Sequence, residues 1–470
     1  MPIQTKRAEV RTGTAPALVR GLNVWHATSI VAGTIIGSGI FLVPAEMMQA
    51  VGSAGLVYLA WVVGGLLSFF GALTYAELGA VRPFAGGEYV YVRDAYGPLP
   101  GFLYGWTWFL IAKPASIASV TAALVRVLGT FSTFAFLPQS LFAWHVTSTR
   151  ALTVNYGHLV AIAATVLITG LNYVGVRKAG NFQFVFTVLK VGIILTVAAV
   201  AFTAATGSWS NFGTSFAGAK GGIAGFMAAL VAALWAYDGW NDLNMVSEEI
   251  ERPERTIPIA LIVGVGLVAV LYIGMNAGIQ RALPATAIAK AAVPAAAASE
   301  AALGRLGISL VSTGMIFSML ATLNGTVMSG GRVPFAVARD GYLFKALAEV
   351  HPVFHTPSLA LVIQALVAIL LIVLGGAFRE LFSLAIFAEW LFYMIAASTI
   401  FVFRRREPDA SRPYRAAGYP VVPALFIGTA AVLLYYTFVS NLRDSIAGLA
   451  VILLGIPVYL WFAHHRSISV

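Results

Sequence analysis

The sequence predicts an all-α membrane protein, and three observations support this fold class. Of the 470 residues, 59% are hydrophobic and 10% are charged, whereas soluble domains are about 45–50% apolar and about 25% charged. Apolar runs of roughly 20 residues, the length that crosses a bilayer, recur along the whole chain. Two of these runs are interrupted by glycine-rich or polar stretches. We therefore expect a single multi-pass membrane domain.

The apolar runs divide into about twelve spans, bounded by polar, proline or glycine residues. They cover residues 22–50, 54–81, 100–128, 155–174, 181–205, 221–250, 256–281, 307–334, 357–375, 380–403, 420–440 and 445–463. Basic residues precede the first span and no small-residue cleavage site follows it, so this span is expected to be a retained helix. Most Lys and Arg residues then lie in cytoplasmic segments, and both the N- and C-termini are predicted to be cytoplasmic.

This topology divides the chain into successive segments. They are a cytoplasmic N-terminal segment (1–21), a ten-helix inverted-repeat core (22–403), a cytoplasmic basic loop (404–419), two peripheral helices (420–463) and a cytoplasmic tail (464–470). The formal charge of +10 is explained by topology, so no nucleic-acid partner is expected. The Ala-rich stretch Ala285 to Ala302 is predicted to form a short external helix across the mouth, with a lid role.

Two spans carry the interruptions. The first contains three glycines between Gly33 and Gly39, each costing a helix about 1 kcal/mol relative to Ala. The sixth is interrupted from Ala236 to Asn241. These positions correspond if spans 1–5 and 6–10 form a 5+5 inverted repeat, and paired broken helices mark a substrate site near the membrane midplane.

The chemistry of the site follows from what an unwound turn exposes. Free N–H groups at a helix start suit a carboxylate, and freed carbonyl groups suit an ammonium group. One zwitterionic α-amino acid satisfies both sets, and irregular backbone is tolerated at this depth only where it lines a cavity or is buried in protein. The alternative for Gly37 and Gly39 is close helix packing.

Several ordered motifs carry a family resemblance. They are Gly33 to Phe41 (GTIIGSGIF), Ala76 to Gly79 (AELG), Gly86-Gly87-Glu88-Tyr89, and Ala236 to Asn241 (AYDGWN) followed by Glu248-Glu249. Over essentially the whole chain the sequence resembles the L-type amino acid transporters of the amino acid–polyamine–organocation superfamily. That group includes light chains of heteromeric exchangers and bacterial serine/threonine and alanine exchangers.

The resemblance implies a set of substrate-binding residues. Backbone groups of the first break would hold the carboxylate and part of the amine, the sixth span would complete the site, and Trp235 would be an outer gate. The expected substrate-binding residues are Ile35, Gly37, Ser38, Gly39, Trp235, Ala236, Tyr237, Asp238, Gly239, Asn241 and Glu389. Core packing is the alternative role for Trp235. Cysteine is absent, so a heavy chain linked by a disulfide is not expected.

Lys113, Lys190, Asp238 and Glu389 sit well inside apolar runs of the predicted spans. A lone charge there costs at least about 2.5 kcal/mol, so each needs a partner or a cavity. Lys190 matches the lysine that sodium-independent relatives carry on helix 5, which implies that its ammonium group stands where sodium-coupled relatives bind a sodium ion. The alternative is an ordinary structural ion pair.

The other ionisable residues have more than one possible role. Lys113 is expected to be structural and paired with Glu389. Asp238 either caps the following half-helix or reads the charge of the substrate side chain. Glu389 departs from the neutral residue expected in the family, so it could set cation acceptance or carry a proton. Glu77 and Glu88 are expected in an inner gate near arginines.

The expected function is sodium-independent exchange of α-amino acids, mainly neutral ones, by alternating access. Proton-coupled symport, with possible acceptance of cationic amino acids, is the alternative. A channel would need a filter or charge ring and an enzyme would need a nucleophile with a base, and the sequence contains neither motif. No cofactor or metal site is expected. The expected partners are the amino acid and the lipid bilayer, in a cell membrane, the inner membrane of a bacterium.

Overall fold

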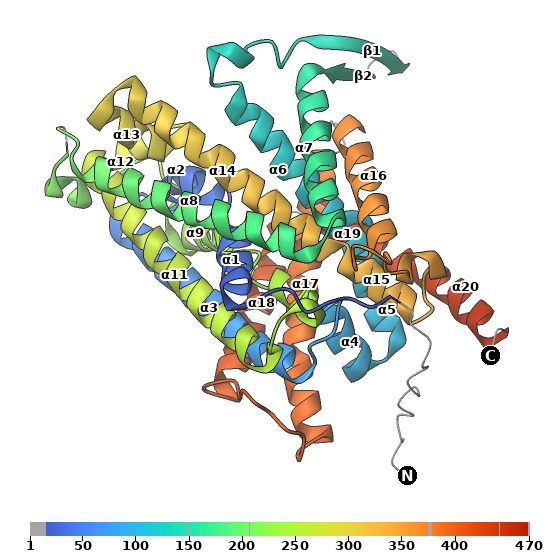
Figure 1. The fold of residues 1–470 in the computed structure, drawn as a ribbon. Helices are drawn as coiled ribbons and strands as arrows, with labels where there is room; N and C mark the ends of the chain where they lie inside the picture. The colour runs from blue at the N-terminus through green and yellow to red at the C-terminus, as the bar shows by residue number, and fades with distance from the viewer. Residues whose placement is uncertain (1–15, 148–149, 206, 375–377, 441, 469–470) are drawn as a thin grey trace.

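A computed structural model describes residues 16–147, 150–205, 207–374, 378–440 and 442–468, and the chain is nearly all helical (Figure 1). The α-helices are α1 (Val24–Ile35), α2 (Gly39–Val51), α3 (Ala54–Val81), α4 (Glu88–Tyr96), α5 (Pro98–Thr107), α6 (Lys113–Leu128), α7 (Tyr156–Tyr173), α8 (Val176–Phe202), α9 (Gly222–Ala236), α10 (Asp242–Met245), α11 (Pro253–Ala282), α12 (Ala285–Lys290), α13 (Pro294–Leu303), α14 (Arg305–Gly330), α15 (Arg332–Arg339), α16 (Ser358–Leu374), α17 (Phe378–Arg406), α18 (Val421–Ser440), α19 (Leu442–Leu453) and α20 (Gly455–Ile468). A π-helix, η1 (Trp108–Ala112), joins α5 to α6. Short 3₁₀ turns are η2 (Ser132–Phe134), η3 (Trp209–Gly213), η4 (Ser247–Glu249) and η5 (Lys345–Ala348).

The helices follow the predicted spans. Within the described ranges, ten helices are long and apolar enough to cross a membrane, and α9 and α16 are shorter apolar helices. The expectation of a helical multi-pass membrane protein is therefore confirmed. The predicted N-terminal segment 1–21 lies mostly outside the described residues.

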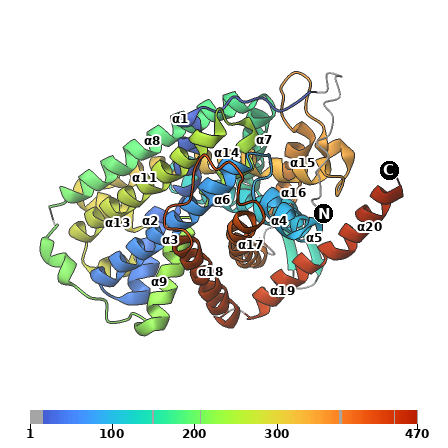
Figure 2. The ribbon, with the colours of Figure 1, turned by 90° about the horizontal axis from the view of Figure 1, so that it is seen from below.

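Long helices pack side by side around the interrupted first span. The helix α11 packs along α3 and α1, α14 packs along α8 and α6, and α2 packs against α9. Figures 1 and 2 show α8 and α11 running alongside one another on one side of the bundle. Small residues permit this packing, because a Cβ atom added at Gly264 of α11 would lie 2.6 Å from Val31 of α1. The first span is therefore held on more than one side.

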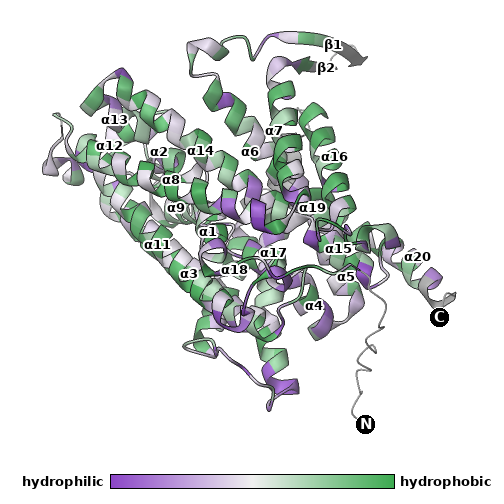
Figure 3. Cartoon of the chain, in the orientation of Figure 1, coloured by the Kyte–Doolittle hydropathy of each residue, from purple (hydrophilic) through white to green (hydrophobic). Residues whose placement is uncertain are grey.

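The two ends of the bundle differ in character. Hydrophobic residues cover the long helices, whereas hydrophilic residues gather around α4, α15 and the end of α17 (Figure 3). We call this the α4 end. Ion pairs join its elements: Glu77 with Arg404 at 2.6 Å and Glu249 with Arg332 at 2.7 Å, the latter between two fully buried side chains. Charged groups thus hold the α4 end together.

The opposite end carries an antiparallel β-hairpin, which the span pattern did not predict. It is formed by β1 (Ser140–Thr147) and β2 (Arg150–Asn155), which connect α6 to α7. We call this the hairpin end. The Ala-rich stretch forms two short helices, α12 and α13, rather than the single helix expected. They pack on α2, and α13 also packs on α8 and α14.

Candidate substrate site

The site begins where the first span is interrupted. The helix α1 ends at Ile35 and α2 begins at Gly39, so backbone groups between them lose their helical partners. Lys190 on α8 satisfies the carbonyl groups, because its ammonium nitrogen donates to the oxygens of Gly33 at 2.6 Å and Ile36 at 2.7 Å. It also reaches the carbonyl oxygen of Ser318 on α14 at 3.4 Å.

Lys190 has carbonyl partners rather than an acidic one. The residue is 1% exposed, and no ion pair in the described part of the chain involves it. The hydroxyl group of Ser318 donates to Ile36 at 2.7 Å. The structural ion pair considered for Lys190 is therefore wrong, and the ammonium group instead joins the broken helix to α14.

The sixth span is interrupted beside the first. Here α9 ends at Ala236. Gly239 has a φ angle of +107°, a backbone conformation that residues with a side chain rarely adopt. The hydroxyl group of Thr34 donates to the carbonyl oxygen of Gly239 at 2.7 Å. The hydroxyl group of Tyr272 lies 3.1 Å from the carbonyl oxygen of Ile35 and 3.0 Å from that of Ala236. The two breaks are thus joined directly and through α11.

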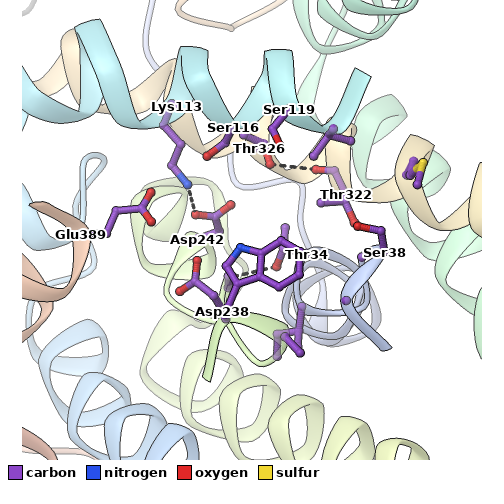
Figure 4. A pocket seen from close by; sticks show the side chains of 18 of the residues that line it. Thr34, Ser38, Lys113, Ser116, Ser119, Asp238, Asp242, Thr322, Thr326 and Glu389 are labelled. Atoms are coloured by element: carbon purple, nitrogen blue, oxygen red, sulfur yellow. Dashed lines mark hydrogen bonds and ion pairs between the residues drawn. The ribbon is translucent and has the colours of Figure 1, made fainter. Parts of the chain in front are cut away.

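A cavity of about 130 Å³ lies between the two breaks. Its walls come from α1, α2, α6, α9, α10, α14 and α17 and from the two breaks. It is lined by Thr34, Ile35, Gly37, Ser38, Gly39, Lys113, Ser116, Ser119, Val120, Ala123, Trp235, Ala236, Asp238, Gly239, Asn241, Asp242, Met319, Thr322, Thr326, Glu389 and Tyr393. Figure 4 shows Ser38 and Thr322 on one side of it, and Lys113, Asp242 and Glu389 on the other.

The charged side contains one lysine and three carboxylates. Lys113 follows the π-helix η1, a rare element that often marks functional sites, and its ammonium group forms an ion pair with Asp242. Asp238 accepts a hydrogen bond from the hydroxyl group of Tyr393 at 3.0 Å. Glu389 makes no hydrogen bond or ion pair with the residues that the structure describes.

Two expectations about these groups are wrong. Lys113 pairs with Asp242 on α10 instead of Glu389. Asp238 does not cap the following helix, because the N-cap residue of α10 is Asn241, which itself makes no side-chain capping bond. The Asp238 carboxylate instead accepts a hydrogen bond from the hydroxyl group of Tyr393. The sequence offers no signal for the pairing of Lys113 with Asp242, because the two residues are 129 positions apart.

Most of the expected substrate-binding residues line the cavity. The residues that do so are Ile35, Gly37, Ser38, Gly39, Trp235, Ala236, Asp238, Gly239, Asn241 and Glu389. Tyr237 does not: its buried ring packs against Trp61 and Tyr272, with ring centroids 5.6 and 5.1 Å apart. Consecutive residues of an irregular turn point in different directions, so the motif alone could not assign Tyr237.

Sequence reasoning missed several polar lining residues. They are Thr34, Ser116, Ser119, Asp242, Thr322, Thr326 and Tyr393. The spacing of residues on α6 could have identified two of them. Lys113, Ser116, Ser119 and Ala123 are three or four positions apart and so share one face of the helix. These residues run from the middle of the span toward Leu128, so the cavity extends toward the hairpin end.

A hydrogen-bonded chain connects the cavity to the α4 end. The Asn241 amide donates to Glu88 at 2.6 Å and accepts from the Tyr393 hydroxyl group at 3.3 Å. Glu88 is wholly buried. Burial raises the pKa of Glu88 from 4.5 to about 7, although the bond from Asn241 opposes this shift. Glu77 contacts arginines as expected, but Glu88 faces the cavity wall instead.

Interrupted helices that line one polar cavity within a bundle of apolar helices define a solute transporter. The amino acid permease family matches residues 22–462, and the chain belongs to this family. Its members are transporters rather than enzymes.

Named relatives support the L-type resemblance. The chain is 30% identical to b(0,+)-type amino acid transporter 1 of Mus musculus over 98% of this chain and 91% of the relative. It is 31% identical to the serine/threonine exchanger SteT of Bacillus subtilis (strain 168), over 94% and 96%. It is also 31% identical to the large neutral amino acids transporter small subunit 2 of Mus musculus, over 95% and 82%. The predicted family is confirmed.

Lys190→Met should reduce transport at least about tenfold, because it removes a charged donor from the carbonyl groups of the broken helix, a loss of roughly 1.5–3 kcal/mol for each bond. The measurement is the initial rate of amino acid uptake by purified protein in vesicles. Lys178→Met is the matched control, since Lys178 is exposed on the same helix. Equal rates in the two variants would contradict the role given to Lys190.

Glu88→Gln should change how stability depends on pH. The folded chain keeps a proton on Glu88 between pH 4.5 and about 7, where the unfolded chain has released it. Stability should therefore fall as pH rises through this window, by up to about 3 kcal/mol, and level off above it. The variant should lose this fall in thermal unfolding from pH 5 to 8. Glu349→Gln, at an exposed loop position, should behave as wild type, and an unchanged profile in Glu88→Gln would refute the assignment.

Proposed function

We propose that the chain is a sodium-independent exchanger of α-amino acids, mainly neutral ones, that works by alternating access. The observation that carries this proposal is the position of Lys190, whose ammonium group binds the freed carbonyls of Gly33 and Ile36 and reaches Ser318. A sodium ion would need oxygen ligands of this kind. A tethered ammonium group supplies the same positive charge without a dissociable ion.

The substrate's charged groups would bind at the two breaks. Ser38 is the N-cap residue of α2, Gly39 is its first residue, and both line the cavity, so their N–H groups are suited to the carboxylate. Carbonyl groups of the breaks are suited to the α-ammonium group. A Cβ atom at Gly39 would lie 3.1 Å from Ala236, so glycine keeps the two breaks close. The small and apolar side chains of Val120, Ala123 and Met319 favour neutral substrate side chains.

Alternating access is supported by the difference between the two ends. The cavity extends along α6 toward the hairpin end, whereas buried ion pairs such as Glu249–Arg332 close the α4 end. We propose that the α4 end and both termini are cytoplasmic. These ion pairs would break when the protein changes to its inward-open state. The proposed architecture has twelve spans, with a 5+5 inverted repeat over 22–403 and peripheral helices over 420–463.

The proposed setting is the inner membrane of a bacterium, because a bacterial exchanger is among the relatives that match almost end to end. The sequence has no cysteine, so a partner linked by a disulfide is not part of the proposal.

Proton-coupled symport is the second candidate function. It is favoured by the hydrogen-bonded chain from Asp238 through Tyr393 and Asn241 to Glu88, because this chain links a carboxylate in the cavity to one at the α4 end. A buried carboxylate whose pKa is raised to about 7 can exchange a proton near neutral pH.

Purified protein in vesicles distinguishes the two functions. Uptake of labelled alanine should require unlabelled amino acid inside, should not respond to a pH gradient in empty vesicles, and should be unchanged when choline replaces sodium. Uptake into empty vesicles driven by a proton gradient would favour symport. Loss of uptake on sodium removal would contradict the role of Lys190.

A further inference from the structure

The cavity has two chemically different sides. Ser38 and Thr322 lie on one, beside the backbone groups proposed to bind the amino acid itself, while Glu389, Asp242 and Lys113 lie on the other (Figure 4). A substrate held by its carboxylate and α-ammonium group near Ser38 would therefore reach the acidic side only with the end of a long side chain. The charges there act on the side chain.

The charges on that side do not balance within the protein. Among the described residues that line the cavity, Lys113 is the only basic one. Its ammonium group forms an ion pair with the carboxylate of Asp242, whose side chain is 2% exposed. The Asp238 carboxylate accepts a hydrogen bond from the hydroxyl group of Tyr393. Glu389 is left with no hydrogen bond or ion pair from the described part of the chain, although carboxylates this deep in a membrane protein normally have a partner.

A metal ion does not fit this arrangement. In the part of the chain that the structure describes, no three acidic or histidine side chains lie close enough to hold one. The three carboxylates come from α17, α10 and the break between α9 and α10, and all three line the cavity. An organic cation, an ammonium or guanidinium group on a flexible chain, suits such a lining because it can donate to more than one carboxylate.

We infer that Glu389, with Asp238 and Asp242 nearby, forms a subsite for a cationic group on the substrate side chain, so that dibasic amino acids are substrates in addition to neutral ones. This inference rests on the proposed function, because the side chain is placed by the binding of the α-carboxylate and α-ammonium groups at the breaks.

Arginine and citrulline test this inference, because they have similar shapes and differ in side-chain charge. In exchange vesicles, arginine should inhibit uptake of labelled alanine at a concentration at least about tenfold lower than citrulline does, since the charge pairs with a carboxylate that has no cationic partner in the described part of the chain. In Glu389→Gln the ratio of the two inhibitory concentrations should fall at least about fivefold. Glu389→Asp should retain part of the ratio, and Glu300→Gln, at an exposed position on α13, should retain all of it.

The ratio within each variant corrects for any general loss of activity. Equal inhibition by arginine and citrulline in the wild-type protein would overturn the subsite while leaving amino acid exchange intact. A ratio unchanged in Glu389→Gln would overturn the role of Glu389. Proton uptake with alanine that disappears in Glu389→Gln, without an arginine preference in wild type, would make Glu389 a proton site instead. Absence of any amino acid exchange would refute the proposed function itself.

Discussion

The structure depends on one constraint, which is that backbone groups freed by breaking a helix inside a membrane must find partners within the protein. In the first span, Lys190 provides such a partner, because its ammonium group donates hydrogen bonds to the carbonyl oxygens of Gly33 and Ile36. Because the same ammonium group reaches Ser318 on α14, satisfying the break also ties together three helices that are distant in sequence.

The second break is joined to the first rather than standing alone. Thr34 donates to the carbonyl oxygen of Gly239, and Tyr272 lies within hydrogen-bonding distance of carbonyl oxygens on both sides. The amino acid site proposed at these breaks would thus be rigid at its backbone end. Specificity would then be set at the opposite end, where Lys113 balances only one of the nearby carboxylates.

The fold and the backbone end of the site were largely predictable, because apolar runs and clustered glycines are local signals. The position of Lys190 followed from its depth in a span and from family resemblance. Long-range partners were not predictable: the ion pair between Lys113 and Asp242 joins residues 129 positions apart, and no periodic pattern connects them. The direction of Tyr237 depends on irregular backbone, which hydropathy does not describe. The β-hairpin lies between two predicted spans, where the span pattern makes no prediction.

A structure of the protein with an amino acid bound, determined by electron cryomicroscopy in sodium-free buffer, tests the central claim most directly. We expect the substrate carboxylate to accept hydrogen bonds from the N–H groups of Ser38 and Gly39, while Lys190 remains on the carbonyl groups of Gly33 and Ile36. A carboxylate bound to Lys113, or Lys190 displaced from these carbonyl groups, would contradict the account.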